Sequence, residues 1–499
     1  MKHLLNIFIL FLFSTTLFAE VKLPEIISTH MVLQCEKQVP IWGSAKPGES
    51  VEVIFAGQTK AVVAAKDGRW MLLLDPMEIS SESRKFTVKG ENTIIIEDVI
   101  VGEVWFCAGQ SNMAYGFKGN EQKEHLPKKG DKLIRYFTPT KPHWRDKKKL
   151  IPGKWVAGGT RFSSVAVNFG ARLRTELNRP VGLLSSWKGG GNIELWLEYN
   201  GCNMFPGLKK HAEFLKKKKA NPLEKMSRKL RGVASYYKST VTKQIPFAIR
   251  GVIWYQGEGN GGERKTYQTK MAALIKGWRK TWHDRVVSYG IKLKEIDPFY
   301  FAFVQLANFG KPYDKPAGGD SWMGVREAQL KSLEIPSTGM AVIIDIGEAG
   351  DIHPKNKYDV GNRLALWPLA KVYKKELVYS GPLYKSQKIE GGKIRLIFDH
   401  IGTGLMVGKK VGLKPTLEVK DGKLGHFSIA GEDKKWFWAE AVIDGKDVLV
   451  SCKDVKKPIA IRYGFAKNPA SANLYNKEGL PASPFRTDDW LLPKIKRKK

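Results

Sequence analysis

A short apolar run that ends in glycine is the feature that most constrains how this 499-residue chain can fold. The run extends from Val99 to Ala108 and is rich in β-branched and aromatic residues, which is typical of a buried strand. Gly109 allows a tight turn directly afterwards, so Ser111 is expected where the strand gives way to a helix. Ligands of open α/β sheets bind at this edge. A serine placed there becomes a nucleophile only if the chain also supplies a base and an oxyanion site.

Apolar runs alternate with helical stretches in the residues that follow. This alternation predicts a parallel sheet with helices on both faces, and therefore an α/β fold class. The predicted strands are Val181–Leu184, Gly251–Tyr255, Phe299–Val304 and Met340–Ile344, and the predicted helices are Phe169–Leu177, Tyr267–Trp282 and Asp359–Tyr373.

Two β-rich regions are expected to flank this α/β domain. Residues 20–98 contain short strands separated by turn signals every 8–12 residues or so, which is typical of a β-sandwich. Residues 99–377 form the predicted α/β domain that contains Ser111, with a lysine-rich surface insertion at about 203–235. Residues 378–499 return to short strands and turns and form a C-terminal β-rich region.

The first 19 residues have a basic start, an apolar centre and a small residue at their end. This pattern predicts a signal peptide over 1–19, and hence a secreted or periplasmic protein. A buried first helix is the alternative. No later segment reaches about 18 apolar residues, so no transmembrane segment is expected. The four cysteines match no zinc-site spacing and predict at most one disulfide.

The formal net charge of +34 is extreme for an enzyme. Because an exported protein rarely meets nucleic acid, the charge favours an anionic polysaccharide or cell surface and no nucleic-acid partner. An ordinary solvated surface is the alternative interpretation. The lysines cluster at Lys128-Lys129, Lys147–Lys149, Lys216–Lys219 and Lys494–Lys499.

Three stretches, in this order, resemble the sialate O-acetylesterase family of the SGNH (GDSL-like) hydrolases. They are Gly109-Gln-Ser-Asn-Met113, Trp254-Tyr-Gln-Gly-Glu-Gly-Asn260 and Asp351-Ile-His-Pro-Lys-Asn-Lys357. The resemblance runs from about residue 24 to Pro484–Asp488. It implies a flavodoxin-like α/β domain and a serine esterase that removes O-acetyl groups from an acetylated oligo- or polysaccharide. No cofactor and no catalytic metal are expected, because the remaining histidines are scattered and no metal motif is present.

His353 is the predicted base for Ser111, since it precedes a helix at the same edge of the sheet. Asp351 is the predicted orienting acid. In many SGNH hydrolases the acid lies three residues before the histidine, and here that position is Gly350. Three arrangements therefore remain open: Asp351 reaches the imidazole, Glu258 replaces it, or the site works as a Ser–His dyad.

Three donors are predicted for the oxyanion. They are the backbone N–H of Ser111, a backbone N–H from the glycine run after the strand at Leu184, and the side-chain amide of Gln256. Within the run Gly189–Gly191, the backbone N–H of Gly190 is favoured as the oxyanion donor, and this assignment holds to within one residue. SGNH enzymes commonly use an asparagine of the block around Gln256 as an oxyanion donor. The resemblance implies that glutamine, here Gln256, takes that role in the sialate O-acetylesterase family.

Asn112, Glu258 and Glu194 are expected to hold the surrounding loops by hydrogen bonds. Methionine at position 113 excludes the Gly-x-Ser-x-Gly turn of α/β-hydrolases. The predicted function is therefore a secreted carbohydrate acetylesterase that forms an acetyl-serine intermediate. A non-catalytic carbohydrate- or polyanion-binding protein derived from an esterase is the alternative, because Gly350 stands where the acid is usual.

Overall fold

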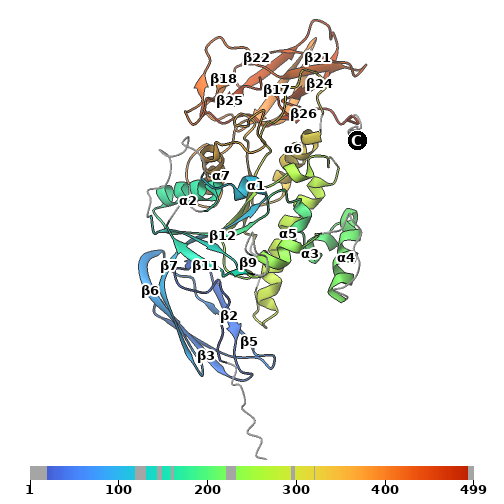
Figure 1. Cartoon of the computed structure of the whole chain (residues 1–499). Coiled ribbons are helices and arrows are strands. Elements are labelled where there is room, and N and C mark those ends of the chain that lie inside the picture. The colour runs from blue at the N-terminus through green and yellow to red at the C-terminus, as the bar shows by residue number, and fades with distance from the viewer. Residues whose placement is uncertain are drawn as a thin grey trace, which may run out of the picture.

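The computed structural model describes residues 20–117, 131–142, 149–158, 162–220, 232–263, 265–293, 298–319 and 321–492. Several sequence predictions lie outside these residues: the signal peptide at 1–19, part of the insertion at 221–231, and the lysine clusters at 128–129, 147–148 and 494–499. Figure 1 shows three parts along the long axis of the molecule, with an N-terminal β unit at one end, an α/β layer in the middle and a C-terminal β region at the other end.

The N-terminal unit has two sheets that share one apolar core. Strand β3 pairs with β4 and β6, and β6 pairs with β7, whereas β2 and β5 form a separate pair. Buried side chains such as Val51, Phe55 and Trp70 fill the core of these sheets. The strands are β1 (Val32–Gln34), β2 (Val39–Ser44), β3 (Ser50–Phe55), β4 (Gln58–Val63), β5 (Arg69–Leu74), β6 (Ser80–Lys89) and β7 (Thr93–Gly109).

Strand β7 is 17 residues long and belongs to both the N-terminal and the central sheet. Apart from Ile96, its residues before position 99 are exposed or half-buried, whereas every residue from Val99 to Gly109 is buried. This change explains the shift in sequence pattern near Val99. The backbone of Asp98 has a positive φ of 56°, which marks an irregularity between the two halves of the strand. The predicted boundary at 98/99 thus lies within one continuous strand.

The central sheet confirms the predicted parallel α/β architecture. Its strand order is β11-β8-β12-β7-β13-β14-β15, and every neighbouring pair from β8 to β15 is parallel. Only β11 runs antiparallel, at the edge beside β8. The strands are β8 (Ile134–Thr138), β11 (Lys154–Ala157), β12 (Val181–Trp187), β13 (Gly251–Tyr255), β14 (Tyr300–Val304) and β15 (Thr338–Ala341), with a small separate pair β9 (Lys141–Pro142) and β10 (Leu150–Ile151).

Helices cover both faces of this sheet because successive side chains of a strand point in opposite directions. In β7, Trp105 packs at 5.0 Å between ring centroids against Phe169 on one face. The next residue, Phe106, packs at 5.4 Å against Trp278 on the other face. Figure 1 shows α2 and α7 on one side and α5 on the other. The helices are α1 (Ser111–Ala114), α2 (Ser164–Leu177), α3 (Tyr199–Asn203), α4 (Lys209–Ala220), α5 (Tyr267–Val287), α6 (Ser321–Lys331) and α7 (Lys357–Lys371).

The predicted elements of this layer are confirmed, with shifted ends. Strand β13 has the predicted bounds, and helices α2 and α5 extend further than predicted. Strand β15 ends at Ala341 rather than Ile344, although residues 342–344 remain buried. An apolar run indicates which residues are buried. It does not mark where the strand ends, because residues beyond the last strand-to-strand hydrogen bond can be equally buried.

The C-terminal region contains two four-stranded antiparallel sheets, β16-β17-β23-β22 and β21-β20-β24-β26, which share an apolar core. Its strands are β16 (Leu383–Glu390), β17 (Lys393–Asp399), β18 (Leu405–Lys409), β19 (Leu417–Glu418), β20 (Phe427–Gly431), β21 (Trp436–Trp438), β22 (Glu440–Asp444), β23 (Asp447–Ser451), β24 (Pro458–Tyr463), β25 (Leu474–Asn476) and β26 (Phe485–Arg486).

The segment after β18 ties the C-terminal region to the start of α7. Lys410, which is nearly buried, forms an ion pair of 2.6 Å with Asp359 in the first turn of α7. Asn356, the N-cap of that helix, donates to the carbonyl oxygen of Gly412 at 3.1 Å. The C-terminal region therefore supports the segment that follows His353.

All four cysteines are unpaired. Cys35, Cys107 and Cys202 are buried and Cys452 is half-buried. Within the described ranges, no helix is both long enough and apolar enough to cross a membrane.

Candidate active site

Ser111 stands at the carboxyl end of β7, as predicted, and is the first residue of α1. Gly109 has a φ of +144°, and a side chain there would meet the carbonyl oxygen of Tyr255 at 2.1 Å. Only glycine permits this approach of β7 to β13. The next residue, Gln110, donates its backbone N–H to the same Tyr255 oxygen at 2.9 Å. The turn that presents Ser111 is thus fixed by the neighbouring strand.

His353 lies beside Ser111 although the two are 242 residues apart in the chain. The Nε2 atom of His353 is 2.9 Å from Oγ of Ser111. The imidazole stacks on the ring of Tyr115, with centroids 6.0 Å apart and planes inclined by 21°. This arrangement can move a proton between the serine hydroxyl and the imidazole.

Asp351 reaches the imidazole despite its unusual spacing. Its Oδ1 atom lies 3.3 Å from Nδ1 of His353 and also accepts the backbone N–H of His353 at 2.9 Å. A short local turn of this kind lets a carboxylate two residues earlier face the ring. The hydrogen bond from the backbone N–H of His353 lowers the pKa of Asp351. Its side chain is 45% exposed, which weakens its electrostatic effect on the ring.

Glu258, the alternative acid, hydrogen-bonds to Asn112 instead of His353. Asn112 Nδ2 donates to Glu258 Oε1 at 2.5 Å and to the carbonyl oxygen of Ile352 at 3.0 Å. Asn112 Oδ1 accepts from Nζ of Lys357 at 2.6 Å. Asn112 therefore connects the serine turn, the turn after β13 and the histidine segment.

Gln256 is completely buried, and its amide is used within the protein. Its Nε2 atom donates toward Gln110 Oε1, Gly191 O and Asn260 Oδ1 at 3.2, 3.1 and 2.7 Å. Its Oε1 atom accepts from the hydroxyl of Tyr267 at 2.7 Å. In this arrangement Gln256 braces the turns around Ser111, and its role toward an oxyanion stays a prediction.

The glycine run after β12 forms a turn beside the serine, in which Gly189 and Gly190 are exposed and Gly191 is buried. The N–H of Gly191 donates to the carbonyl oxygen of Lys188 at 3.0 Å. A Cβ atom placed on Gly189 would lie 4.0 Å from Cβ of Ser111. The favoured Gly190 has a φ of +64° and open space around its Cβ position. The run thus lies beside the serine, with Gly189 approaching it.

Glu194 belongs to a polar cluster behind this turn. Its carboxylate accepts from Nδ2 of Asn260 at 3.0 Å and from Nζ of Lys270 at 2.5 Å. Asn260 in turn accepts the N–H of Ile193 at 2.9 Å. The lysine and asparagine contacts lower the pKa of Glu194 against the effect of its burial, so it stays ionised and can hold the loop.

Three neighbours of the candidate triad were not predicted as site residues from the sequence. Gln110 Oε1 accepts from Gly259 N at 3.0 Å as well as from Gln256, so it braces the serine turn. Tyr115 stacks on His353. Lys357 is buried and bonded to Asn112. Gln110 and Lys357 lie inside the motifs that carry the family resemblance, so the sequence could have indicated that both are near the site.

Metal-ligating side chains gather once among the described residues, at Cys35, Glu36 and Glu103. Arg179 and Arg250 already donate to Glu103, each at 2.8 Å. Because two guanidinium groups neutralise the carboxylate, this cluster is an ion-pair network rather than a cation site.

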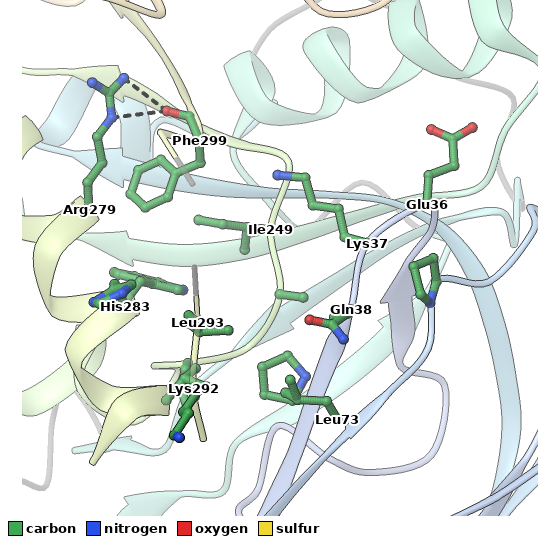
Figure 2. Close-up of a pocket in the computed structure, with 16 residues that line it drawn as sticks. Glu36, Lys37, Gln38, Leu73, Ile249, Arg279, His283, Lys292, Leu293 and Phe299 are labelled. Atoms are coloured by element: carbon green, nitrogen blue, oxygen red, sulfur yellow. Dashed lines mark hydrogen bonds between the residues drawn. The ribbon is translucent and has the colours of Figure 1, made fainter. Parts of the chain in front are cut away.

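A cavity of about 670 Å³ lies between the N-terminal unit and α5 (Figure 2). Ala248, Ile249 and Phe299 line it, and these residues precede β13 and β14. Figure 2 also shows Arg279 donating to the carbonyl oxygen of Phe299, so this guanidinium is engaged by the protein. The cavity is therefore at the amino ends of the strands, opposite the edge that carries Ser111.

Comparisons with known proteins agree with the resemblance. Residues 101–365 match the family described as carbohydrate esterase, sialic acid-specific acetylesterase. The sialate O-acetylesterase of Mus musculus is 27% identical over 522 residues, covering 92% of this chain and 93% of the relative. That of Homo sapiens is 26% identical, covering 92% and 91%.

A solved structure extends the likeness to the whole fold. The crystal structure of a carbohydrate acetylesterase from Xanthomonas citri has a TM-score of 0.76 and 32% sequence identity, and the match covers 94% of this chain and 100% of that one. These matches identify the protein as a carboxylic ester hydrolase, and the chain belongs to the sialic acid-specific acetylesterase family of carbohydrate esterases.

Proposed function

We propose that this protein is a secreted or periplasmic serine esterase that removes O-acetyl groups from carbohydrates through an acetyl-serine intermediate. The 2.9 Å contact between Ser111 Oγ and His353 Nε2 at the carboxyl edge of the sheet carries this proposal. It pairs a nucleophile with a base in hydrogen-bond reach, which acyl transfer requires.

The proposed reaction has two steps. Ser111 Oγ attacks the acetyl carbonyl while its proton passes to Nε2 of His353. The C–O bond to the sugar then breaks, and the imidazolium returns that proton to the departing sugar oxygen. A water molecule next attacks the acetyl carbonyl, and His353 accepts its proton. The bond between the carbonyl carbon and Ser111 Oγ then breaks, the imidazolium returns the proton to Oγ, and acetic acid leaves and ionises to acetate. Asp351 lies against Nδ1 and favours the tautomer that leaves Nε2 free to accept.

The oxyanion is proposed to face the N–H of Ser111 and the glycine turn, with Gln256 as the third donor. The approach of Gly189 to Ser111 supports a contribution from that turn. Gln256 would have to release one of its three internal acceptors to donate to the substrate. Preorganised donors of this kind stabilise the charge that develops on the carbonyl oxygen.

The catalytic layer is proposed to be an SGNH-type, flavodoxin-like domain. With the edge strands β8 and β11 set aside, the remaining strands lie in the order second-first-third-fourth-fifth along the chain. This is the flavodoxin-like order, whose switch point falls between the first and third strands. Here those strands are β7 and β13, and Ser111 and Gln256 follow them directly.

The proposed substrates are O-acetylated sugars, with O-acetylated sialic acids first. The mammalian relatives are named sialate O-acetylesterases and the Xanthomonas citri protein a carbohydrate acetylesterase. The net charge of +34 favours an anionic polymer, because long-range attraction raises its local concentration. If so, the initial rate on such a polymer will fall as salt is raised, whereas the rate on a neutral acetate ester will not.

Export is proposed from the pattern of residues 1–19. Expression of the full chain in a bacterial host, followed by amino-terminal sequencing of the periplasmic or medium fraction, tests it. A mature protein that begins near Glu20 supports export, and an uncleaved cytoplasmic protein contradicts it.

Acetate release tests the function. We expect wild type to release acetate from 4-nitrophenyl acetate and from at least one of acetylated sialosides, acetylated xylan and acetylated acidic polysaccharides. Replacing Ser111 by alanine should lower kcat by at least about 1,000-fold, because the nucleophile is lost. Ser164→Ala is a matched control, since this serine is also buried near the site and its hydroxyl has no hydrogen-bond partner among the described residues.

A stable, monodisperse wild type that is as inactive as Ser111→Ala on every substrate would overturn the proposal. Binding measurements on the same sugars would then test the non-catalytic alternative.

A further inference from the structure

Lys357 is a completely buried lysine that contacts Asn112, the residue after Ser111. It is the first residue of α7, four positions after His353. Its Nζ atom donates to Asn112 Oδ1 at 2.6 Å. It also lies over the rings of Tyr115 and Tyr255, 5.1 and 5.5 Å from their centroids. Lysine is among the residues least often buried, so this placement calls for a reason.

No carboxylate of the described residues lies within ion-pair distance of this amine. Three acidic groups face it from further away: Glu258 in the turn after β13, and Asp351 and Glu348 in the segment before α7. Burial lowers the pKa of Lys357 to about 7, and these carboxylates offset only part of that effect. A buried amine without a direct counter-charge is costly, and simple packing would be served better by methionine or leucine.

The hydrogen bond from Lys357 determines which way the amide of Asn112 faces. With its oxygen held by Nζ, the amide nitrogen must point to the opposite side. There it donates to Glu258 Oε1 at 2.5 Å and to the carbonyl oxygen of Ile352 at 3.0 Å. A flipped amide would set its NH₂ group against the amine and leave both acceptors without a donor.

These contacts join the two halves of the candidate dyad. Asn112 follows Ser111, and Ile352 precedes His353, so the bond from Asn112 to Ile352 spans the contact between serine and imidazole. Both the charged and the neutral form of the Lys357 amine carry N–H donors, so the bond to Asn112 does not require one protonation state.

We propose that Lys357 is a positioning residue that orients Asn112 and thereby holds Ser111 and His353 at reacting distance. The inference rests on the proposed function. Lys357 does not touch substrate in this role, so its loss lowers kcat and leaves KM nearly unchanged. A displacement of about 1 Å in a reacting pair can reduce a rate by about 100-fold, and a loss of about 10- to 100-fold in kcat is expected for Lys357→Met.

Steady-state kinetics on 4-nitrophenyl acetate test the proposal, with wild type, Ser111→Ala and Lys357→Met measured together. Lys371→Met is the matched control, because Lys371 is the last residue of the same helix, its side chain is exposed, and it should keep wild-type kcat and KM. A Lys357→Met variant with kcat within about twofold of wild type, or one that changes only KM, would overturn the proposal.

A second variant covers the case in which Lys357→Met does not fold. Asn112→Asp keeps an acceptor for the Lys357 amine and gives it a counter-charge, but its second oxygen faces Glu258 and Ile352 O and cannot donate to either. We expect a similar 10- to 100-fold loss of kcat, and a wild-type kcat in this variant would also overturn the proposal. The proposed function fails separately, if wild type is no more active than Ser111→Ala.

Discussion

Asp351 precedes His353 in the chain, Lys357 follows it, and the two side chains differ in their exposure. Asp351 is 45% exposed and contacts the ring directly, whereas Lys357 is buried and acts on the dyad through Asn112. Solvent screens the first group and leaves the second unscreened. The residue that looks like the acid of a triad is therefore expected to contribute less than its position suggests.

The effect of Asp351→Asn follows from this exposure. Asparagine keeps the acceptor for the backbone N–H of His353 and removes only the charge. Exposed ion pairs are worth up to about 1 kcal/mol, so a loss of no more than about 5-fold in kcat/KM is expected. A buried triad aspartate of a serine protease contributes about 10⁴-fold.

The effect of Asp351 on the rate should decrease at low pH, where its carboxylate becomes protonated. Because the pKa of Asp351 is lowered, its carboxylate stays charged down to below about pH 4, and whatever it contributes is lost only as the pH falls through that lowered value. From about pH 5 to about pH 9 the carboxylate stays charged, so no change in the ratio of wild-type to variant rates over this range comes from titration of Asp351 itself. A loss of about 1,000-fold would contradict this interpretation.

Helix α7 is the element that carries the histidine segment, and a buried ion pair anchors it. Arg363 donates to Asp345 at 2.6 and 2.8 Å, and both side chains are nearly inaccessible. Arg363 also donates to the carbonyl oxygen of Val342, just beyond β15. The ion pair therefore fixes α7 to the segment between β15, the last strand of the central sheet, and His353.

Removing one partner of this pair should destabilise the fold. In Arg363→Met the carboxylate of Asp345 is left buried and unpaired, which costs about 3–5 kcal/mol in the free energy of unfolding. The double variant Arg363→Met, Asp345→Leu removes both charges and should lose clearly less. Guanidinium unfolding curves measure the difference, and equal losses in the single and double variants would show that packing, not the charge, dominates.

Over the whole molecule, the N-terminal unit and the central α/β layer are parts of one structure. Strand β7 belongs to both sheets, and β1 pairs with it at residues 100–102, beyond the predicted boundary. Arg135 of the central sheet donates to both the carbonyl and carboxylate oxygens of Asp98. At the opposite end of the molecule, the C-terminal region is bound to α7 through the ion pair between Lys410 and Asp359.

A chain that begins at residue 99 should therefore not fold as a soluble domain. It lacks β1 and β6, so β7 loses its N-terminal partners and the apolar core of that unit is missing. Expression of residues 99–499 beside 20–499, followed by size exclusion and calorimetry, tests this. A monodisperse 99–499 protein with wild-type activity would show that the two parts fold separately.

The sequence by itself determined the elements and the motifs. Strand and helix periodicity depends on neighbours within a few residues, so β13, α2 and α5 could be read from it, and the three motif stretches pointed to the family. The same patterns placed Ser111 and His353 at one edge of the sheet, because carboxyl ends of parallel strands meet there.

Only the tertiary structure decided what surrounds that pair. Whether Asp351 reaches the ring depends on a turn, and whether Gln256 is engaged depends on acceptors from three separate segments. The burial of Lys357 and the continuity of β7 depend on contacts between residues far apart in the chain. Such contacts leave no local periodicity, since they are set by how whole elements pack, and the physical reason for a buried lysine becomes visible only when Asn112 stands beside it.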